Sequence, residues 1–102
     1  MAEIIWAERS LTQLNEIAEY IALSNPMAAA ALVNKIYNKI QRLELFPKSG
    51  RAPIETSEFS YREIVLPPCR IIYQIENDLI HILYVMREER DLRKFLLNNP
   101  IQ

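Results

Sequence analysis

Residues 61–86 carry the clearest alternating pattern of side chains in the chain. Over residues 69–76 every second side chain falls on the same face, which is the two-residue period of a β-strand. One face then holds Cys69, Ile71, Tyr73 and Ile75, and the other holds Arg70, Ile72, Gln74 and Glu76. Apolar, β-forming residues also fill 61–66 and 79–86. The pattern therefore predicts three consecutive strands.

The connections between these strands carry their own signals. Pro67 and Pro68 cannot donate the hydrogen bonds of a strand ladder, so they mark a connection between two strands. Asn77 and Asp78 tolerate positive φ and bond to their own backbone, which favours a turn after Glu76. The last two strands are therefore expected to form a hairpin.

The first half of the chain follows the helical period instead. Glu3–Trp6 is a short β-forming run, and from Arg9 onward apolar residues recur at three- and four-residue steps. Asn25 is a favourable N-cap and Pro26 suits the first helical position, so a second helix is expected from there to about Leu45. The apolar stripe of the first helix is Leu11, Leu14, Ala18 and Ile21, widened by Ile17 and Tyr20. The stripe of the second is Ala29, Val33, Ile36, Ile40 and Leu43, flanked by Leu32 and Tyr37.

The segments around the helices and strands complete the predicted fold. Pro47 prevents continuation of the second helix, and Gly50 is expected to adopt a backbone conformation closed to other residues. After the strands, a charged stretch over 87–91 leads into residues 92–97, a short amphipathic helix or tail. We therefore expect an α+β fold in one domain over residues 1–102. Its order is β-α-α-β-β-β, with a helical hairpin packed on one face of a small, mainly antiparallel sheet.

Composition narrows the classes of protein that fit. The 102 residues suffice for one modest core, and no stretch approaches the ~20 consecutive apolar residues of a membrane helix. The N-terminus lacks the pattern of a signal peptide and Cys69 is the only cysteine, so we expect a cytoplasmic, reducing location. A net charge of −1 argues against bulk attraction to nucleic acid. The single glycine, Gly50, excludes glycine-rich phosphate loops.

Few residues could act in catalysis. His81 is the only histidine and lies mid-strand, where a packed or edge-facing side chain is the more common outcome. A nucleophilic pair of Cys69 with His81 on an adjacent strand stays open, although a buried, inert thiol is the more common fate of a lone cysteine. One cysteine and one histidine do not make a zinc site, and the consecutive Glu88 and Glu89 face different ways. We predict no metal and no cofactor.

Short motifs are spread over nearly the whole chain. They are Trp6-Ala7-Glu8 before the first helix, Phe46-Pro47 with Gly50, Tyr61-Arg62-Glu63-Ile64, Arg70 to Ile75, and Arg87 with Arg90-Asp91. In order, spacing and total length they resemble the RelE/ParE superfamily of toxins from bacterial type II toxin–antitoxin modules. The resemblance implies a partner antitoxin that wraps and neutralises the protein. It also implies one of two activities, because RelE-like members cut mRNA on the ribosome whereas ParE-like members act on DNA gyrase and stall replication.

A RelE-like ribonuclease needs a base for the 2′-OH, an acid for the leaving oxygen and cations at the phosphate. The candidate cations are Arg51, Arg62, Arg70, Arg87 and Arg90. Of these, Arg70 and Arg90 match arginines that RelE-like members use on the phosphate. The alternative is that the arginines pair with carboxylates such as Glu63, Glu89 and Asp91. No histidine or tyrosine stands where the resemblance places the acid or base, at the end of the last strand or in the terminal helix, so the ribonuclease set is incomplete.

A ParE-like toxin requires only a stable fold, an exposed target surface and an apolar groove for its antitoxin. We therefore predict a ParE-like toxin without catalytic residues that inhibits DNA gyrase, with Arg87 and Arg90 in its target-binding surface. A ParD-like or similar, partly disordered antitoxin is expected to bind Leu92, Phe95 and Leu96 and to carry the complex onto operator DNA. Those three residues could also close the protein's own core. The alternatives are a RelE-like ribosome-dependent mRNA endoribonuclease, and a degenerate toxin that acts only as antitoxin partner and co-repressor.

Overall fold

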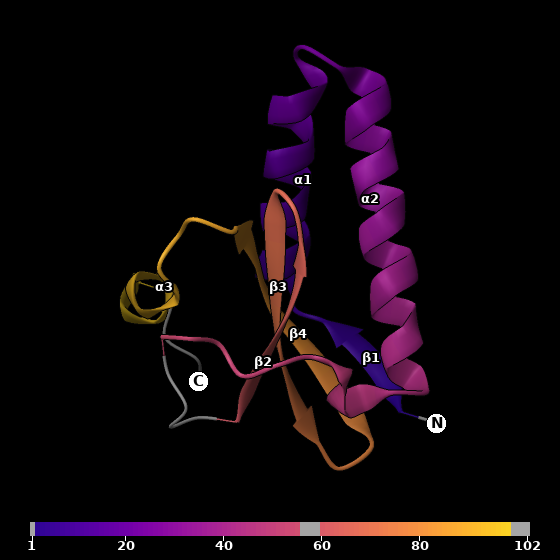
Figure 1. Cartoon of the computed structure of the whole chain (residues 1–102), viewed down its shortest axis with the longest axis vertical. Coiled ribbons are helices and arrows are strands. Elements are labelled where there is room, and N and C mark those ends of the chain that lie inside the picture. Colours follow the sequence, from indigo (N-terminus) through magenta and orange to yellow (C-terminus); the bar gives the residue numbers. More distant parts are fainter. Residues whose placement is uncertain (1, 56–59, 99–102) are drawn as a thin grey trace.

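The computed structural model describes residues 2–55 and 60–98 and shows an α+β fold (Figure 1). Its elements are β1 (Glu3–Trp6), α1 (Glu8–Ala22), α2 (Pro26–Gln41), the 3₁₀ turns η1 (Arg42–Glu44) and η2 (Pro47–Ser49), β2 (Tyr61–Leu66), β3 (Cys69–Glu76), β4 (Leu79–Arg87) and α3 (Leu92–Asn98). The predicted order β-α-α-β-β-β with a short terminal helix is confirmed. Within the described ranges, no helix has the length and apolar character needed to cross a membrane.

The four strands form one sheet in the order β1-β4-β3-β2, in which β1 runs parallel to β4 and the other neighbours are antiparallel. Asn77 lies in the turn between β3 and β4 at a φ of 56°, so the predicted hairpin is confirmed. The register of β3 against β4 shifts between Ile72 and Tyr73, which leaves Leu83 as an extra residue on β4. This bulge brings Leu83 and Tyr84 into the same apolar cluster beneath α3.

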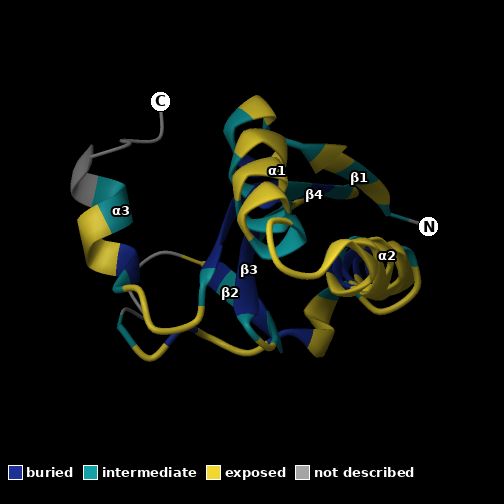
Figure 2. Cartoon of the chain, turned by 90° about the horizontal axis from the view of Figure 1, so that it is seen from above, coloured by how far each residue is buried: buried dark blue, intermediate teal, exposed yellow. Residues whose placement is uncertain are grey.

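Both faces of the sheet are covered, as Figure 2 shows: the helical hairpin of α1 and α2 packs on one face and α3 lies on the other side. The hairpin-side core contains Leu14, Leu32, Ile36, Ile40, Leu43, Ile64, Cys69, Ile71, Tyr73, Ile80, Ile82 and Val85. The α3-side core contains Tyr61, Ile72, Leu83, Tyr84, Met86 and Leu92. The predicted alternation of β3 is therefore confirmed. A second apolar layer also explains why β4 reads as a continuous apolar run rather than an alternating one.

The start of α2 matches the prediction, whereas its end does not. The Oδ1 atom of Asn25 accepts a hydrogen bond from the N–H of Ala28 at 3.0 Å, and Pro26 is the first helical residue. The α-helix ends at Gln41, earlier than the expected Leu45. The chain tightens there into η1, and the N–H of Leu45 donates to the carbonyl of Arg42 at 3.1 Å.

The apolar stripe predicted for α1 is only partly buried. Leu14 faces the core, but Leu11 is exposed because Ser10 takes the inward position beside it and donates its hydroxyl to the carbonyl of Ala7 at 2.6 Å. Tyr20 is 69% exposed because the tip of the hairpin extends past the end of the sheet (Figure 1). The helical period thus located α1 correctly, but the depth of burial depends on how far the sheet reaches.

Gly50 is required for a different reason from the one expected. Its φ of −75° and ψ of 159° are ordinary extended values, so the expected conformation closed to other residues is wrong. A Cβ atom at Gly50 would instead lie 2.5 Å from the Tyr73 hydroxyl and 2.8 Å from the Glu63 carbonyl oxygen. The Tyr73 hydroxyl accepts a hydrogen bond from the Gly50 N–H at 2.9 Å and donates one to the Pro47 carbonyl at 2.7 Å. Close approach to this buried tyrosine excludes a side chain.

Candidate functional site

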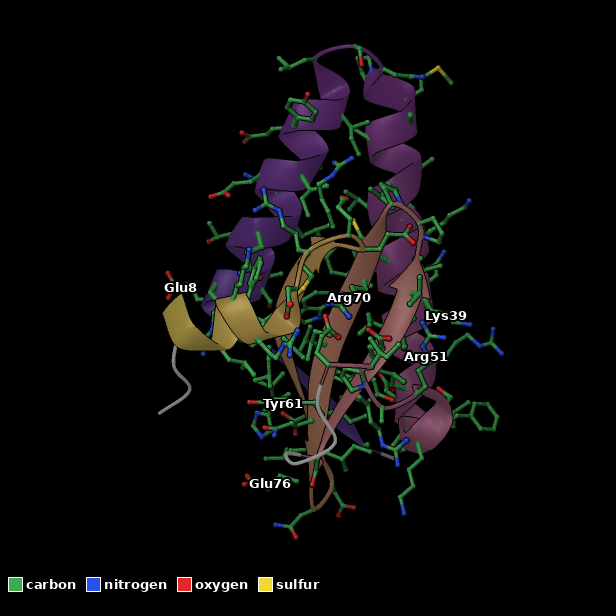
Figure 3. The ribbon with its side chains drawn as sticks, turned by 60° about the vertical axis from the view of Figure 1, so that its left-hand side comes forward. Glu8, Lys39, Arg51, Tyr61, Arg70 and Glu76 are labelled. Atoms are coloured by element: carbon green, nitrogen blue, oxygen red, sulfur yellow. The ribbon has the colours of Figure 1, made fainter. Side chains whose placement is uncertain are left out.

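The structure does not bring the five predicted arginines together. Arg70 lies in a buried cluster over the sheet, and Arg51 lies nearby at the edge formed by β2 (Figure 3). Arg62 lies on β2 and donates to the carbonyls of Lys48 and Gly50. Arg87 and Arg90 lie beyond them, at the end of β4 and next to α1. There are thus two arginine sites with different surroundings.

Arg70 is held by two carboxylates. Its Nη1 atom donates to Oε1 of Glu55 and to Oε2 of Glu63, each at 2.9 Å. Its Nη2 atom donates to Oε2 of Glu55 and, at 2.6 Å, to the carbonyl of Arg90. The Glu55 carboxylate also accepts the backbone N–H of Leu92 at 2.9 Å. We call this group of Arg70, Glu55 and Glu63 the arginine clamp; it joins the sheet, the segment before β2 and the start of α3.

Strand geometry brings two members of the clamp together. Arg70 pairs with Val65 across the β2–β3 ladder, so Glu63 lies diagonally opposite Arg70 on the same face of the sheet. The Glu63 carboxylate also binds Arg51 at 3.0 Å, and residues 51 and 63 exchange two backbone hydrogen bonds. Glu55 comes from the irregular segment before β2, so no periodicity in the sequence could identify it as a partner.

The ion pair between Arg70 and Glu55 favours the charged form of both side chains. The pKa of Glu55 is lowered from its usual 4.5 to about 2, mainly because Arg70 donates side-chain hydrogen bonds to the carboxylate. The hydrogen bonds that Arg70 donates to Glu55 raise the pKa of Arg70 despite its burial. The Arg70 side chain is only 6% exposed. At neutral pH its charge is therefore neutralised within the protein.

We expect this pKa shift to appear as a pH dependence of stability. Because the folded pKa is below the unfolded one, the stabilisation from Glu55 is complete above about pH 4.5 and is lost as the pH falls toward about 2. The free energy of unfolding of the wild type should therefore fall more steeply over this range than that of Glu55→Gln. Urea denaturation at a series of pH values measures the difference, and parallel curves for the two proteins would contradict it.

Three of the other arginines also have partners within the protein, two of them carboxylates as the alternative of paired arginines expected. Arg62 donates to the carbonyl of Gly50 at 2.8 Å. Arg51 binds Glu63, and Arg87 binds Glu89 at 3.3 Å. Within residues 2–55 and 60–98 the guanidinium of Arg90 has no ion pair.

Among the described residues, the cysteine and the histidine do not form a catalytic pair. In the β3–β4 ladder Cys69 lies opposite Arg87, and His81 lies opposite Gln74. At least five residues along the strands therefore separate the thiol from the imidazole. The alternative of a nucleophilic Cys69–His81 pair is wrong. Cys69 is buried, and burial raises the pKa of its thiol. His81 is half-buried, with Nε2 3.7 Å from a Glu76 oxygen.

The tyrosines on the α3 side of the sheet are equally poor bases. Tyr61 and Tyr84 are buried, and burial is the main cause that raises the pKa of each phenol. The guanidinium of Arg9 lies 5.0 Å from the centre of the Tyr84 ring, and the Phe95 ring packs edge-on against it at 5.9 Å. These contacts serve packing. Among the described residues, moreover, no three His, Cys, Asp or Glu side chains are grouped as a metal site would need.

The second arginine site is an exposed hollow between β4 and α1. Arg87 and Arg90 line it with Glu16, Ile17 and Tyr20, around a volume of about 410 Å³. The sequence predicted the two arginines but not their α1 neighbours. The only signal was Tyr20, an aromatic residue at the margin of the apolar stripe. An exposed tyrosine in one hollow with two arginines is a typical composition for a protein-binding surface.

The predicted antitoxin-binding residues are divided by their burial. Leu92 is fully buried in the α3-side core, so it closes the protein's own core in this structure. Phe95 and Leu96 are half-buried against the same cluster. Their role toward an antitoxin stays a prediction.

A helical hairpin thus packs on a four-stranded sheet, and an exposed hollow lined by Arg87 and Arg90 lies at the end of β4. A family model described as "ParE toxin of type II toxin-antitoxin system, parDE" matches residues 4–92. The chain belongs to this family.

Curated relatives agree with this assignment. The chain is 31% identical over 91 residues to "Toxin RelE2" of Caulobacter vibrioides, a match covering 88% of this chain and 99% of that protein. It is 40% identical over 85 residues to "Putative toxin Y4kP" of Sinorhizobium fredii, covering 81% of this chain and 84% of the relative. Both relatives are named as toxins, and the chain spans most of their length.

Solved structures share the fold. One from the chromosomal ParDE toxin–antitoxin system of P. aeruginosa has a TM-score of 0.71 at 22% identity, covering 87% of this chain and 98% of that one. Another, from the toxin–antitoxin complex RelBE2 of Mycobacterium tuberculosis, has a TM-score of 0.56 at 16% identity, covering 85% of this chain and 98% of that one. Both likenesses concern the fold of the chain.

Proposed function

We propose that the protein is a ParE-like toxin that inhibits DNA gyrase and is neutralised by a cognate antitoxin. It acts in the cytoplasm by binding rather than by catalysis. Arg87 and Arg90 form the surface that contacts gyrase. The antitoxin contacts α3 through Phe95 and Leu96, and brings the complex to operator DNA.

One observation carries the choice of gyrase over mRNA: Arg70, one of the two arginines expected at an RNA phosphate, is bound by Glu55 and Glu63. A phosphate would have to displace two carboxylates from a buried cation, which costs several kcal/mol per unpaired buried charge. The neighbouring phenols of Tyr61 and Tyr84 are buried and protonated at neutral pH. The geometry thus supports binding better than RNA cleavage.

A RelE-like mRNA endoribonuclease is the second candidate. The reason is that the chain matches 99% of the length of a relative named "Toxin RelE2". In that case the arginine clamp would open on the ribosome to release Arg70. A degenerate toxin that only binds its antitoxin is the third candidate. It would have the same fold without either activity.

Two parallel reactions with antitoxin-free protein distinguish the candidates. One measures supercoiling of relaxed plasmid by gyrase, and the other measures cleavage of a defined mRNA on translating ribosomes. The proposal expects lost supercoiling or trapped, cleaved plasmid while the mRNA stays intact. Cleaved mRNA with normal supercoiling would establish the ribonuclease, and no effect in either reaction would leave the degenerate toxin.

Substitution of the exposed arginines tests the proposed gyrase surface. We expect Arg87→Ala and Arg90→Ala each to raise the concentration needed for half-inhibition of gyrase by about 30-fold, the effect of a ~2 kcal/mol hot spot, and to abolish growth arrest. Neither should unfold the protein, because both side chains lie at the surface. Arg93→Ala is the matched control, since Arg93 is exposed on α3 and its ion pair among the described residues is with Asp91. Unchanged toxicity of both variants would place the surface elsewhere.

A further inference from the structure

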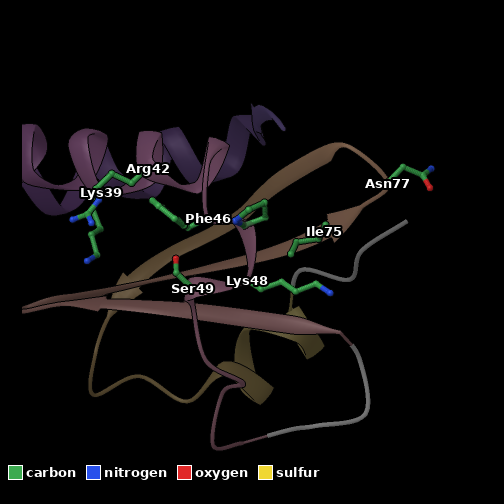
Figure 4. Close-up of a pocket in the computed structure, with 8 residues that line it drawn as sticks. Lys39, Arg42, Phe46, Lys48, Ser49, Ile75 and Asn77 are labelled. Atoms are coloured by element: carbon green, nitrogen blue, oxygen red, sulfur yellow. The ribbon is translucent and has the colours of Figure 1, made fainter. Parts of the chain in front are cut away.

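A cavity of about 660 Å³ lies at the C-terminal end of α2, opposite the tip of the hairpin (Figure 1), and Figure 4 shows the side chains that line it. The end of α2, the η1–η2 connection and the β3–β4 hairpin form its walls. Its lining is Lys39, Arg42, Phe46, Pro47, Lys48, Ser49, Ile75 and Asn77. Its volume is in the range of cavities that bind small ligands or one or two side chains of a partner.

The charge of this cavity has one sign. Lys39 enters it from α2, Arg42 from the start of η1 and Lys48 from η2. In the described part of the chain none of the three forms an ion pair. The dipole of α2 accounts for two cations near its C-terminus, but it does not account for Lys48 on the other wall. Three unpaired cations around one hollow attract an anionic ligand.

Apolar groups lie among these cations. Phe46 is 58% exposed, and Ile75 and Pro47 contribute further apolar surface at half-buried positions. An exposed phenylalanine beside lysines and an arginine offers contact to an apolar group and to negative charges at once. The cavity therefore matches a ligand in which an apolar group is surrounded by carboxylates.

We propose that this cavity binds a peptide segment of a partner protein, in which one aromatic or aliphatic side chain is flanked by Asp or Glu residues. The apolar side chain packs on Phe46 and Ile75. The flanking carboxylates pair with Lys39 and Arg42 on one wall and with Lys48 on the other.

A peptide fits this cavity better than a nucleic acid does. Single-stranded nucleic acid needs a groove of cations that continues along its backbone. Here the cations of the described lining, Lys39, Arg42 and Lys48, surround one hollow and do not continue as a groove. The net charge of −1 provides no long-range attraction either. A short acidic segment needs only the local cations.

Fluorescence anisotropy with defined probes tests the proposal. The probe is a fluorescein-labelled peptide, SGEDDLFEEDGS; a second peptide has Lys in place of each acidic residue, and a third probe is a 12-nucleotide single-stranded RNA. We expect binding of the acidic peptide alone. The double variant Lys39→Glu/Arg42→Glu and the single variant Phe46→Ala should each weaken it at least about tenfold. Lys94→Glu is the matched control on α3, on the other side of the sheet, and should leave binding within about twofold.

Shifts of the Ile75 methyl signal in the NMR spectrum of the wild-type protein should accompany peptide binding. The proposal is overturned if the acidic peptide does not bind, or if the lysine peptide binds equally well. It is also overturned if the cavity variants bind like Lys94→Glu. Binding of the RNA that is lost in the same variants would show a nucleic-acid site instead. Neither arginine site is altered, so the result does not depend on the target of the toxin.

Discussion

Arg70→Ala is expected to lower the free energy of unfolding by about 3–5 kcal/mol, the typical cost of removing one partner from a buried ion pair. The substitution leaves the carboxylates of Glu55 and Glu63 buried without their main cation. It also removes the hydrogen bond from Arg70 to the Arg90 carbonyl, so the start of α3 loses support. Urea denaturation followed by the fluorescence of Trp6 measures the change.

The matched controls separate charge from size. Arg93→Ala removes the same side chain from an exposed pair on α3 and should cost less than about 1 kcal/mol. The triple variant Arg70→Met, Glu55→Gln, Glu63→Gln removes all three charges and should recover part of the lost stability. An Arg70→Ala protein as stable as Arg93→Ala would show that the clamp does not form in solution.

The clamp also affects how any loss of toxicity in Arg70→Ala is interpreted. Arg70 and Glu55 both bond to the backbone near Arg90, the residue proposed to contact gyrase. Loosening the clamp can therefore displace the target surface without Arg70 touching a target. If Arg70 contacted RNA instead, Glu55→Gln would free the Arg70 guanidinium from one carboxylate and raise the rate of mRNA cleavage. Under the gyrase proposal Glu55→Gln lowers stability and creates no cleavage.

Gly50→Ala is expected to destabilise the protein by about 2–4 kcal/mol, combining overpacking with the loss of a buried hydrogen bond. The new Cβ would meet the Tyr73 hydroxyl and ring at 2.5 and 2.7 Å and the Glu63 carbonyl oxygen at 2.8 Å. Tyr73 is fully buried and Glu63 is held by β2 and Arg51, so neither can move away cheaply. Chemical denaturation gives the magnitude.

A double-mutant cycle with Tyr73→Phe tests the stated cause. Removing the hydroxyl eliminates the shortest contact, so Gly50→Ala should cost less in a Tyr73→Phe background than in the wild type. Ser49→Ala, at the exposed neighbouring position, should change stability by less than about 0.5 kcal/mol. Equal costs of Gly50→Ala in the two backgrounds would show that contact with Tyr73 is not the cause.

Much of the fold could be predicted from the sequence because its signals are local. The alternation of 69–76 depends only on the pleat of a strand, and it placed Arg70 on the face opposite Ile71 and Tyr73. The cap at Asn25 and the turn at Asn77 depend on hydrogen bonds and φ values within a few residues. Such features do not require knowledge of what packs against them.

Other features depend on contacts between distant segments, so only the tertiary structure decided them. The partner of Arg70, Glu55, is 15 residues away on an irregular segment without periodicity. The need for Gly50 arises from Tyr73, 23 residues further along the chain. The depth of burial of Tyr20 and Leu92 depends on where the sheet ends and where α3 docks. Hydrogen-bonding capacity and side-chain period are properties of the residues themselves, whereas burial, ion pairing and steric exclusion exist only between segments that folding has brought together.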